Sequence, residues 1–134
     1  MNWLAQIAAT VFGMVIGALW YSPLLFEKAW EKEVGMTEEK KKATNMPLQI
    51  IGSVALLFII AIFLRVTVLN HAVGEFATFQ HGLAHGLGVT IFVVIPILGQ
   101  KALFDQSGWK LFGMNVGYWL VSLLGMCAIL SGWQ

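Results

Sequence analysis

The feature that most constrains the fold is a stretch at residues 76–99 that contains no Asp, Glu, Lys or Arg. An α-helix needs about 20 mostly apolar residues to cross the hydrocarbon core of a bilayer, so this stretch is long enough to span one. It nevertheless carries Gln80, His81 and His85 close to its start, directly after Glu75. Ionisable groups inside a membrane are costly and are functional candidates by default. The stretch therefore predicts both a membrane location and a polar site.

Three other apolar runs extend this interpretation to the whole chain. Of the 134 residues, 58% are hydrophobic and 11% are charged, whereas soluble chains average about 25% charged residues. We therefore predict an all-α, polytopic membrane protein that forms a single domain over residues 1–134. The four transmembrane helices are expected at about 3–21, 46–68, 76–99 and 109–132.

The first loop is predicted to contain two short helices, at about 24–34 and 37–44. The first of these has Phe26 and Trp30 on an apolar side and charged residues on the other, which is typical of a helix lying along the bilayer surface. Lysines concentrate in this loop and in the third connection: Lys28, Lys32, Lys40, Lys41, Lys42, Lys101 and Lys110. On the other side of the membrane the only Lys or Arg is Arg65. Because positive residues favour the cytoplasmic side, this bias predicts a multi-pass protein with both termini non-cytoplasmic.

Charge and motifs exclude several classes of function. The net charge is +1 and no basic stripe with interleaved aromatic residues is present, which argues against a nucleic-acid partner. Cys127 is the single cysteine, so it cannot form an intrachain disulfide. No nucleophile elbow or phosphate-binding glycine loop occurs, and the apolar runs contain no pair of carboxylates. We expect the lipid bilayer as a partner, no required cofactor, and a function other than catalysis.

Small residues form stripes on three of the predicted helices. Glycines spaced four residues apart allow two membrane helices to approach closely. Such stripes could pack helices within one protomer or between protomers, and we predict a homo-oligomer. The candidate packing glycines are Gly13, Gly17, Gly82, Gly86, Gly113 and Gly117.

His81 and His85 are four residues apart, so their side chains leave the same face of a helix, as in metal-binding pairs. Two ligands do not complete a zinc site, which generally needs three or four protein ligands. Completion would require His71, Glu75 or another residue from a neighbouring helix or subunit. Three interpretations stay open: a polar site that senses pH or substrate, histidines that hydrogen-bond between helices, and ligands to a metal or haem.

Polar residues on other predicted helices could line the same site as His81 and His85. Gln6 and Thr10 lie on the polar stripe of the first helix, Asn115 lies on the fourth, and Glu75 precedes the third. The function first predicted is therefore a small homo-oligomeric channel- or transporter-like protein for an unidentified ion or small molecule. One alternative is a metal- or haem-binding membrane protein. Another is a structural or accessory subunit whose aromatic residues dock a partner.

Two stretches of the sequence carry a family resemblance. The first is Trp20-Tyr21-Ser22-Pro23 followed by Trp30, an interface motif because Trp and Tyr favour the membrane–water boundary. The second is Asn115-Val116-Gly117-Tyr118 with the later Trp133. Over nearly its whole length the chain resembles domain of unknown function 1761, a family of small, mostly bacterial, four-helix membrane proteins. The resemblance implies a fold and a cell (inner) membrane location, and it implies no activity.

Overall fold

The computed structural model describes all 134 residues, and every regular element in it is helical. This confirms the predicted all-α fold class, with four helices that are long and apolar enough to span a membrane. The observed spans are Trp3–Trp20, Met46–Val68, Phe79–Asp105 and Trp109–Gly132. They are formed by α1 (Trp3–Trp20), α4 (Met46–Phe63) with the π-helical turn η1 (Leu64–Val68), α5 (Phe79–Val89) with the π-helical turn η3 (Thr90–Val94) and α6 (Ile95–Asp105), and α7 (Trp109–Gly132).

The third span differs from its expected range of 76–99, since it begins at Phe79 and continues past Pro96 to Asp105. Proline has no N–H to donate to the carbonyl four residues earlier, and its ring crowds that carbonyl. Here η3 lies directly before α6, which has Pro96 in its first turn. The wider π-helical turn accommodates the proline, so the helix continues where the sequence indicated an end.

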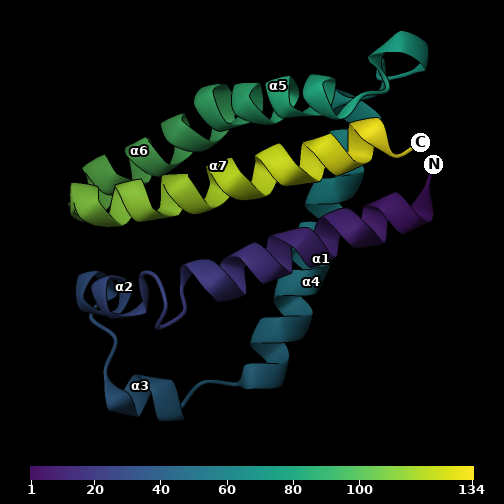
Figure 1. Cartoon of the computed structure of the whole chain (residues 1–134). Coiled ribbons are helices and arrows are strands. Elements are labelled where there is room, and N and C mark those ends of the chain that lie inside the picture. Colours follow the sequence, from purple (N-terminus) through teal and green to yellow (C-terminus); the bar gives the residue numbers. More distant parts are fainter.

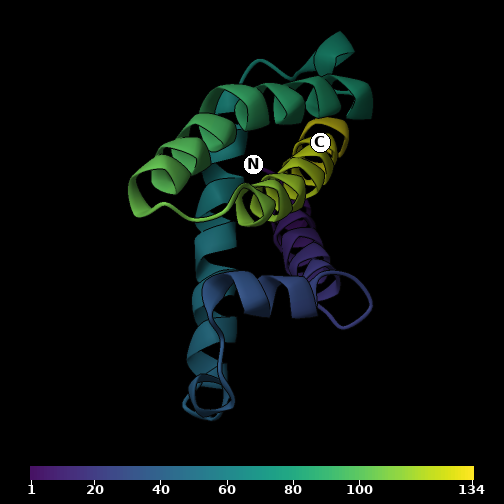
Figure 2. The ribbon, with the colours of Figure 1, turned by 90° about the vertical axis from the view of Figure 1, so that its left-hand side faces the viewer.

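The four spans are arranged around α7, which lies between α5–α6 on one side and α1 on the other (Figure 1). α4 packs chiefly on α1 and is strongly inclined to the other three spans, as Figures 1 and 2 show. The closest approach is between α5 and α7. A Cβ on Gly82 would lie 2.2 Å from the carbonyl oxygen of Cys127, and one on Gly86 would lie 2.6 Å from that of Leu123. Only glycine permits this contact.

The remaining candidate packing glycines divide into two groups. Gly13 faces Leu57 of α4 and Met126 of α7, and a Cβ on Gly17 would lie in van der Waals contact with the ring of Tyr118. Gly117 lies beneath the indole of Trp20, where a Cβ would be 2.6 Å from the ring. Gly113 is exposed and has no neighbour in a position to meet a side chain.

The first loop contains α2 (Glu27–Val34) and α3 (Glu38–Lys42). Its aromatic residues pack against protein: the Phe26 ring lies 5.0 Å from that of Trp20, and the Trp30 ring lies 5.8 Å from that of Tyr21. The two helices are joined by an ion pair of 2.7 Å between Lys41 Nζ and Glu31. This hydrogen bond to Glu31 raises the pKa of Lys41.

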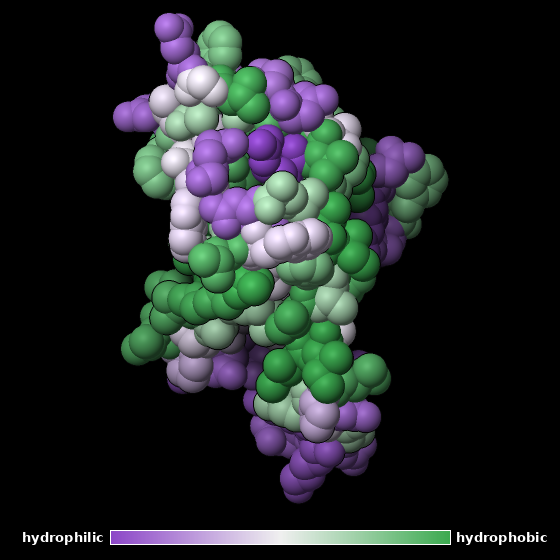
Figure 3. Space-filling view, turned by 90° about the vertical axis from the view of Figure 1, so that its right-hand side faces the viewer, coloured by the Kyte–Doolittle hydropathy of each residue, from purple (hydrophilic) through white to green (hydrophobic).

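The two chain ends lie beside each other at one end of the bundle (Figure 1). The Asn2 side chain, which caps α1, also donates to the carbonyl of Trp133 over 3.4 Å. The same end contains the link between η1 and α5. Figure 3 views the molecule from this side and shows hydrophilic residues gathered among hydrophobic ones.

Candidate metal centre

Two of the three histidines are positioned by the first turns of α5. Thr78 is the N-cap of this helix, and its hydroxyl accepts a hydrogen bond of 3.1 Å from the backbone N–H of His81. His85 follows one turn later on the same side of the helix. Because Gly82 and Gly86 press α5 against α7, the backbone that carries both histidines is held at a fixed depth in the bundle.

The third histidine lies on the link that follows η1. Leu69 and Ala72, on either side of His71, are both fully buried and anchor this link. The guanidinium of Arg65 donates to the carbonyl of Leu69, which fixes the link further. His71 itself is exposed, so its imidazole extends from an anchored backbone.

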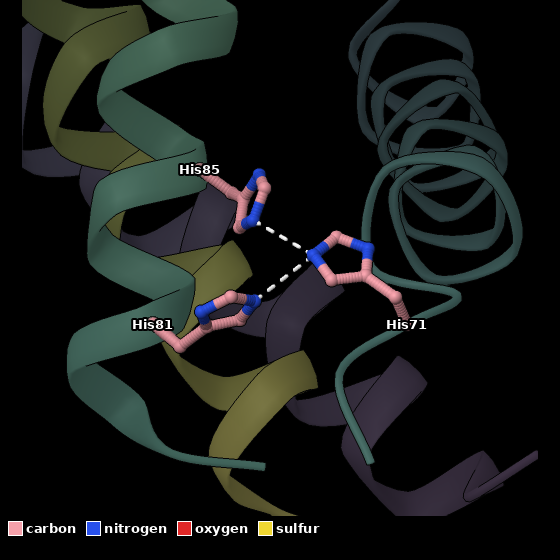
Figure 4. A group of neighbouring side chains, drawn as sticks. All are labelled: His71, His81 and His85. Carbon is pink, nitrogen blue, oxygen red and sulfur yellow. Dashed lines mark hydrogen bonds between the residues drawn. The ribbon is translucent and has the colours of Figure 1, made fainter. Parts of the chain in front are cut away.

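The three imidazoles converge on one point between α5 and the end of the second span (Figure 4). His71 Nε2 lies 3.1 Å from His85 Nε2 and 3.1 Å from His81 Nε2. One potential ligand nitrogen from each of the three residues lies within 4.8 Å of the others. These are all the histidines in the chain.

Hydrogen bonding alone does not satisfy this arrangement well. A neutral imidazole has one N–H and one in-plane lone pair, on different nitrogens. His71 Nε2 therefore has either one proton or one lone pair to share between two neighbours at 3.1 Å. Protonating the rings would place like charges next to each other. A metal cation between the three nitrogens could instead accept one lone pair from each of them.

Glu75, predicted as a possible co-ligand, is not part of the cluster. It lies in the 3₁₀ turn η2 (Gly74–Phe76) and is exposed. The next residue, Phe76, places its ring 5.4 Å from that of His81, and its carbonyl accepts a hydrogen bond from Ser131 of α7. The turn thus contributes an aromatic neighbour to the cluster, and the potential ligands in the cluster are all histidines.

None of the other predicted co-lining residues forms a hydrogen bond with the histidines. Gln6 and Thr10 are buried on α1, where the Thr10 hydroxyl donates to the Gln6 carbonyl over 2.9 Å. Asn115 accepts a hydrogen bond of 2.7 Å from the Tyr21 hydroxyl. Along α7, Asn115 is 12 residues from Cys127, the contact of Gly82, and this corresponds to about 18 Å at 1.5 Å per residue.

The interface motif forms a separate, aromatic cluster near the start of α7. Trp20 Nε1 donates to the Met114 carbonyl over 2.9 Å, and the Tyr21 ring lies 5.5 Å from that of Tyr118. Burial, with a smaller effect of Tyr118, raises the pKa of Tyr21 to about 12. Ser22 donates to the Leu19 carbonyl and closes the turn that contains Pro23. These contacts attach the end of α1 to α7.

Sequence reasoning named His71 only as one of several possible third ligands. The signal for it was its position in a link so short that the helices on either side must be neighbours. The sequence analysis did not predict which groups surround Arg65. The signal that could have indicated a polar environment there was a lone arginine late in an otherwise apolar run.

The fold and the histidine cluster define the class: an all-helical protein with four potential membrane spans and a three-histidine site at one end. Over residues 4–131 the sequence matches the family described as protein of unknown function, DUF1761. The chain belongs to this family. Neither a search of curated proteins nor a search of solved structures gave a match.

Proposed function

We propose that this protein is a membrane protein that binds a transition-metal ion through the Nε2 atoms of His71, His81 and His85. The observation that carries the proposal is the convergence of the three imidazoles, with His71 Nε2 at 3.1 Å from each of its neighbours. Zn–N bonds of about 2.0–2.1 Å in a tetrahedral site separate the ligand nitrogens by about 3.3 Å. Small side-chain movements would therefore convert this cluster into a metal site.

The ligand set indicates which ions fit. Imidazole suits Zn²⁺, Cu²⁺, Ni²⁺ and iron, whereas Mg²⁺ and Ca²⁺ prefer oxygen ligands, which this cluster lacks. The three potential ligand nitrogens lie within 4.8 Å of one another, which favours a single ion over haem. Three histidines leave one position of a tetrahedral ion open for water or another ligand. His71 is exposed, which gives the ion a route of entry.

A channel- or transporter-like function, the first prediction from the sequence, would need a continuous polar path. The residues predicted to line it do not form one group: Gln6 lies at the same end as the histidines but forms no hydrogen bond with them, and Asn115 is bound to Tyr21 near the start of α7. Metal binding at one end requires no such path, and it uses each histidine of the chain. For these reasons we favour metal binding over conduction.

The test is the metal content of the purified protein, produced without a polyhistidine tag. We expect about one Zn²⁺ or Cu²⁺ per chain by elemental analysis after equilibration with the free ion. His71→Ala, His81→Ala and His85→Ala should each weaken binding at least about tenfold, the lower limit of the loss seen when even supporting groups are removed. Gln80→Ala, an exposed change next to His81, is the matched control and should bind as the unmodified chain.

Acidification offers a second readout of the same site. Protons compete with the metal for imidazole nitrogen, so affinity should fall as the pH drops below about 6. If the unmodified chain holds no metal at neutral pH, or if all three alanine variants bind as tightly as it does, the proposal is wrong.

Homo-oligomerisation is a separate proposal supported by the exposed Gly113 and the exposed apolar faces of the spans, since the other five candidate glycines pack within the chain. Gly113 is a suitable position to examine, because it has no neighbour within the chain. The mass of the intact protein in detergent should exceed that of one chain. A complex containing only monomer would contradict the proposal.

A further inference from the structure

Apart from the histidines, the same end of the bundle contains a cavity of about 400 Å³ between α1, η1 and the end of α7. Its lining includes Asn2, Gln6, Arg65 and Trp133 and no acidic residue. Arg65 is the only arginine in the chain. Its guanidinium donates to the Leu69 carbonyl and to the Gln134 side chain, and it forms no ion pair with any Asp or Glu.

Arg65 has no ion pair with an acidic side chain. Arg65 belongs to the potential membrane span Met46–Val68, and ionisable residues in such segments usually pair with a group of opposite charge. Here the protein supplies only neutral acceptors to the guanidinium. A planar guanidinium with donors to spare matches the geometry of a carboxylate or phosphate group.

Gln6 provides an independent observation at the same cavity. It is only 1% exposed, it lines the cavity, and neither Nε2 nor Oε1 of its side chain has a hydrogen-bond partner. A buried amide without partners is destabilising, so a native chain retains one where something else satisfies it. The NH2 group of the amide can donate to an anion, and its carbonyl oxygen can accept from a hydroxyl group.

We propose that this cavity binds an organic anion, a carboxylate or phosphate, that carries a hydroxyl group beside the charge. Arg65 holds the anionic oxygens, and Gln6 bonds to the anion through Nε2 and to the hydroxyl through Oε1. This chemistry occurs in free phosphate esters and hydroxycarboxylates, and also in the glycerol phosphate head group of a phospholipid. The site uses none of the histidines and does not depend on the metal proposal.

The experiment measures binding to the full chain in detergent, with any terminal tag removed because both chain ends line the cavity. Glycerol 3-phosphate and lactate are the soluble probes. Native mass spectrometry with phosphatidylglycerol and phosphatidylcholine is the lipid arm. Binding of the soluble probes alone identifies a free anion as the ligand. Retention of phosphatidylglycerol but not phosphatidylcholine, with competition by glycerol 3-phosphate, identifies a head group. If neither arm shows binding, the proposal is overturned.

Variants then test which residues of the cavity bind the ligand. Arg65→Met should weaken binding at least about tenfold, Arg65→Lys should weaken it less, and Lys110→Met, a cation remote from the cavity, should leave it unchanged. Gln6→Met should weaken binding and raise the thermal midpoint of the ligand-free protein, because it removes an unsatisfied buried amide. A purely structural Gln6 would give the opposite change in midpoint. If Arg65→Met does not fold, Arg65→Lys and Gln6→Met carry the test, and binding unchanged in both overturns the proposal.

Discussion

The two ends of the bundle differ in whether their polar side chains find partners within the chain. Near the start of α7, Trp20 and Tyr21 have their hydrogen-bond donors satisfied by Met114 and Asn115. At the other end, His71 Nε2 faces two imidazoles at once, Arg65 has no carboxylate partner, and the Gln6 amide has no partner. At the first end these side chains are paired within the chain, whereas at the second the proposed metal ion and anion would supply the missing partners. The predictions below test this difference.

The largest effect is expected where α5 meets α7. Gly82→Ala would place a Cβ 2.2 Å from the Cys127 carbonyl, a contact with backbone that must force the helices apart. We expect a loss of about 3 kcal/mol or more in the free energy of unfolding, the upper range for overpacking, together with loss of metal binding.

Gly88→Ala is the matched control on the same helix, since nothing lies close enough to meet its Cβ. It should raise stability by about 0.5–1 kcal/mol through helix propensity. Denaturation by sodium dodecyl sulfate in mixed micelles measures both variants. Equal stability of the two variants would show that α5 and α7 are not packed closely enough to exclude a Cβ at residue 82.

Metal removal should affect only the end of the bundle that contains the three histidines. At a free metal concentration of about 100 times the dissociation constant, binding stabilises the folded state by about 2.7 kcal/mol, and a chelator should remove this. Tyr21→Phe should show the same chelator-dependent shift in thermal midpoint as the unmodified chain. His85→Ala, with an affinity at least about tenfold lower, should keep at most about 1.4 kcal/mol of the stabilisation and show a clearly smaller shift. A shift of equal size in His85→Ala would place the metal elsewhere.

Trp20→Phe tests the end of the bundle that contains Trp20 and Tyr21. It removes the hydrogen bond to the Met114 carbonyl and part of the ring that covers Gly117. We expect a cost of about 1–2 kcal/mol, since a part-buried carbonyl loses its side-chain donor and the ring loses packing against α7, with no change in metal affinity. A change in metal affinity would show that the two ends are coupled.

The smallest effect is expected from Tyr21→Phe, which leaves Asn115 Oδ1 without its donor and should cost about 1 kcal/mol. Alkaline pH distinguishes this residue from the others. Its pKa is raised from 10.0 to about 12, so the folded state holds the phenol proton more tightly than the unfolded state does. The resulting stability is present below pH 10.0 and is lost as the pH rises towards 12. Thermal midpoints from pH 9 to 12 should fall less steeply for Tyr21→Phe.

Sequence patterns predicted the helical fold because long apolar runs leave few alternatives. They also placed His81 and His85 on one face, which follows from helical periodicity. They could not place His71, since the path of a link depends on which side chains bury, here Leu69 and Ala72. The passage of the helix through Pro96 depends on a π-helical turn that no local pattern indicated. The Arg65 cavity is formed by three elements distant in sequence, so periodicity within any one of them could not reveal it.

The glycine contact between α5 and α7 also bears on how quickly a bound ion would leave. His81 and His85 share one helix pressed against a neighbouring backbone, whereas His71 belongs to a link that includes Gly74 with a φ of 58°. Release would then begin with His71, the exposed ligand, and the less exposed pair on α5 would retain the ion until it departs. Gly74→Ala, which strains that link, should accelerate exchange more than it alters affinity. His81 and His85 would determine which ion is bound, and His71 would determine how long the ion stays bound.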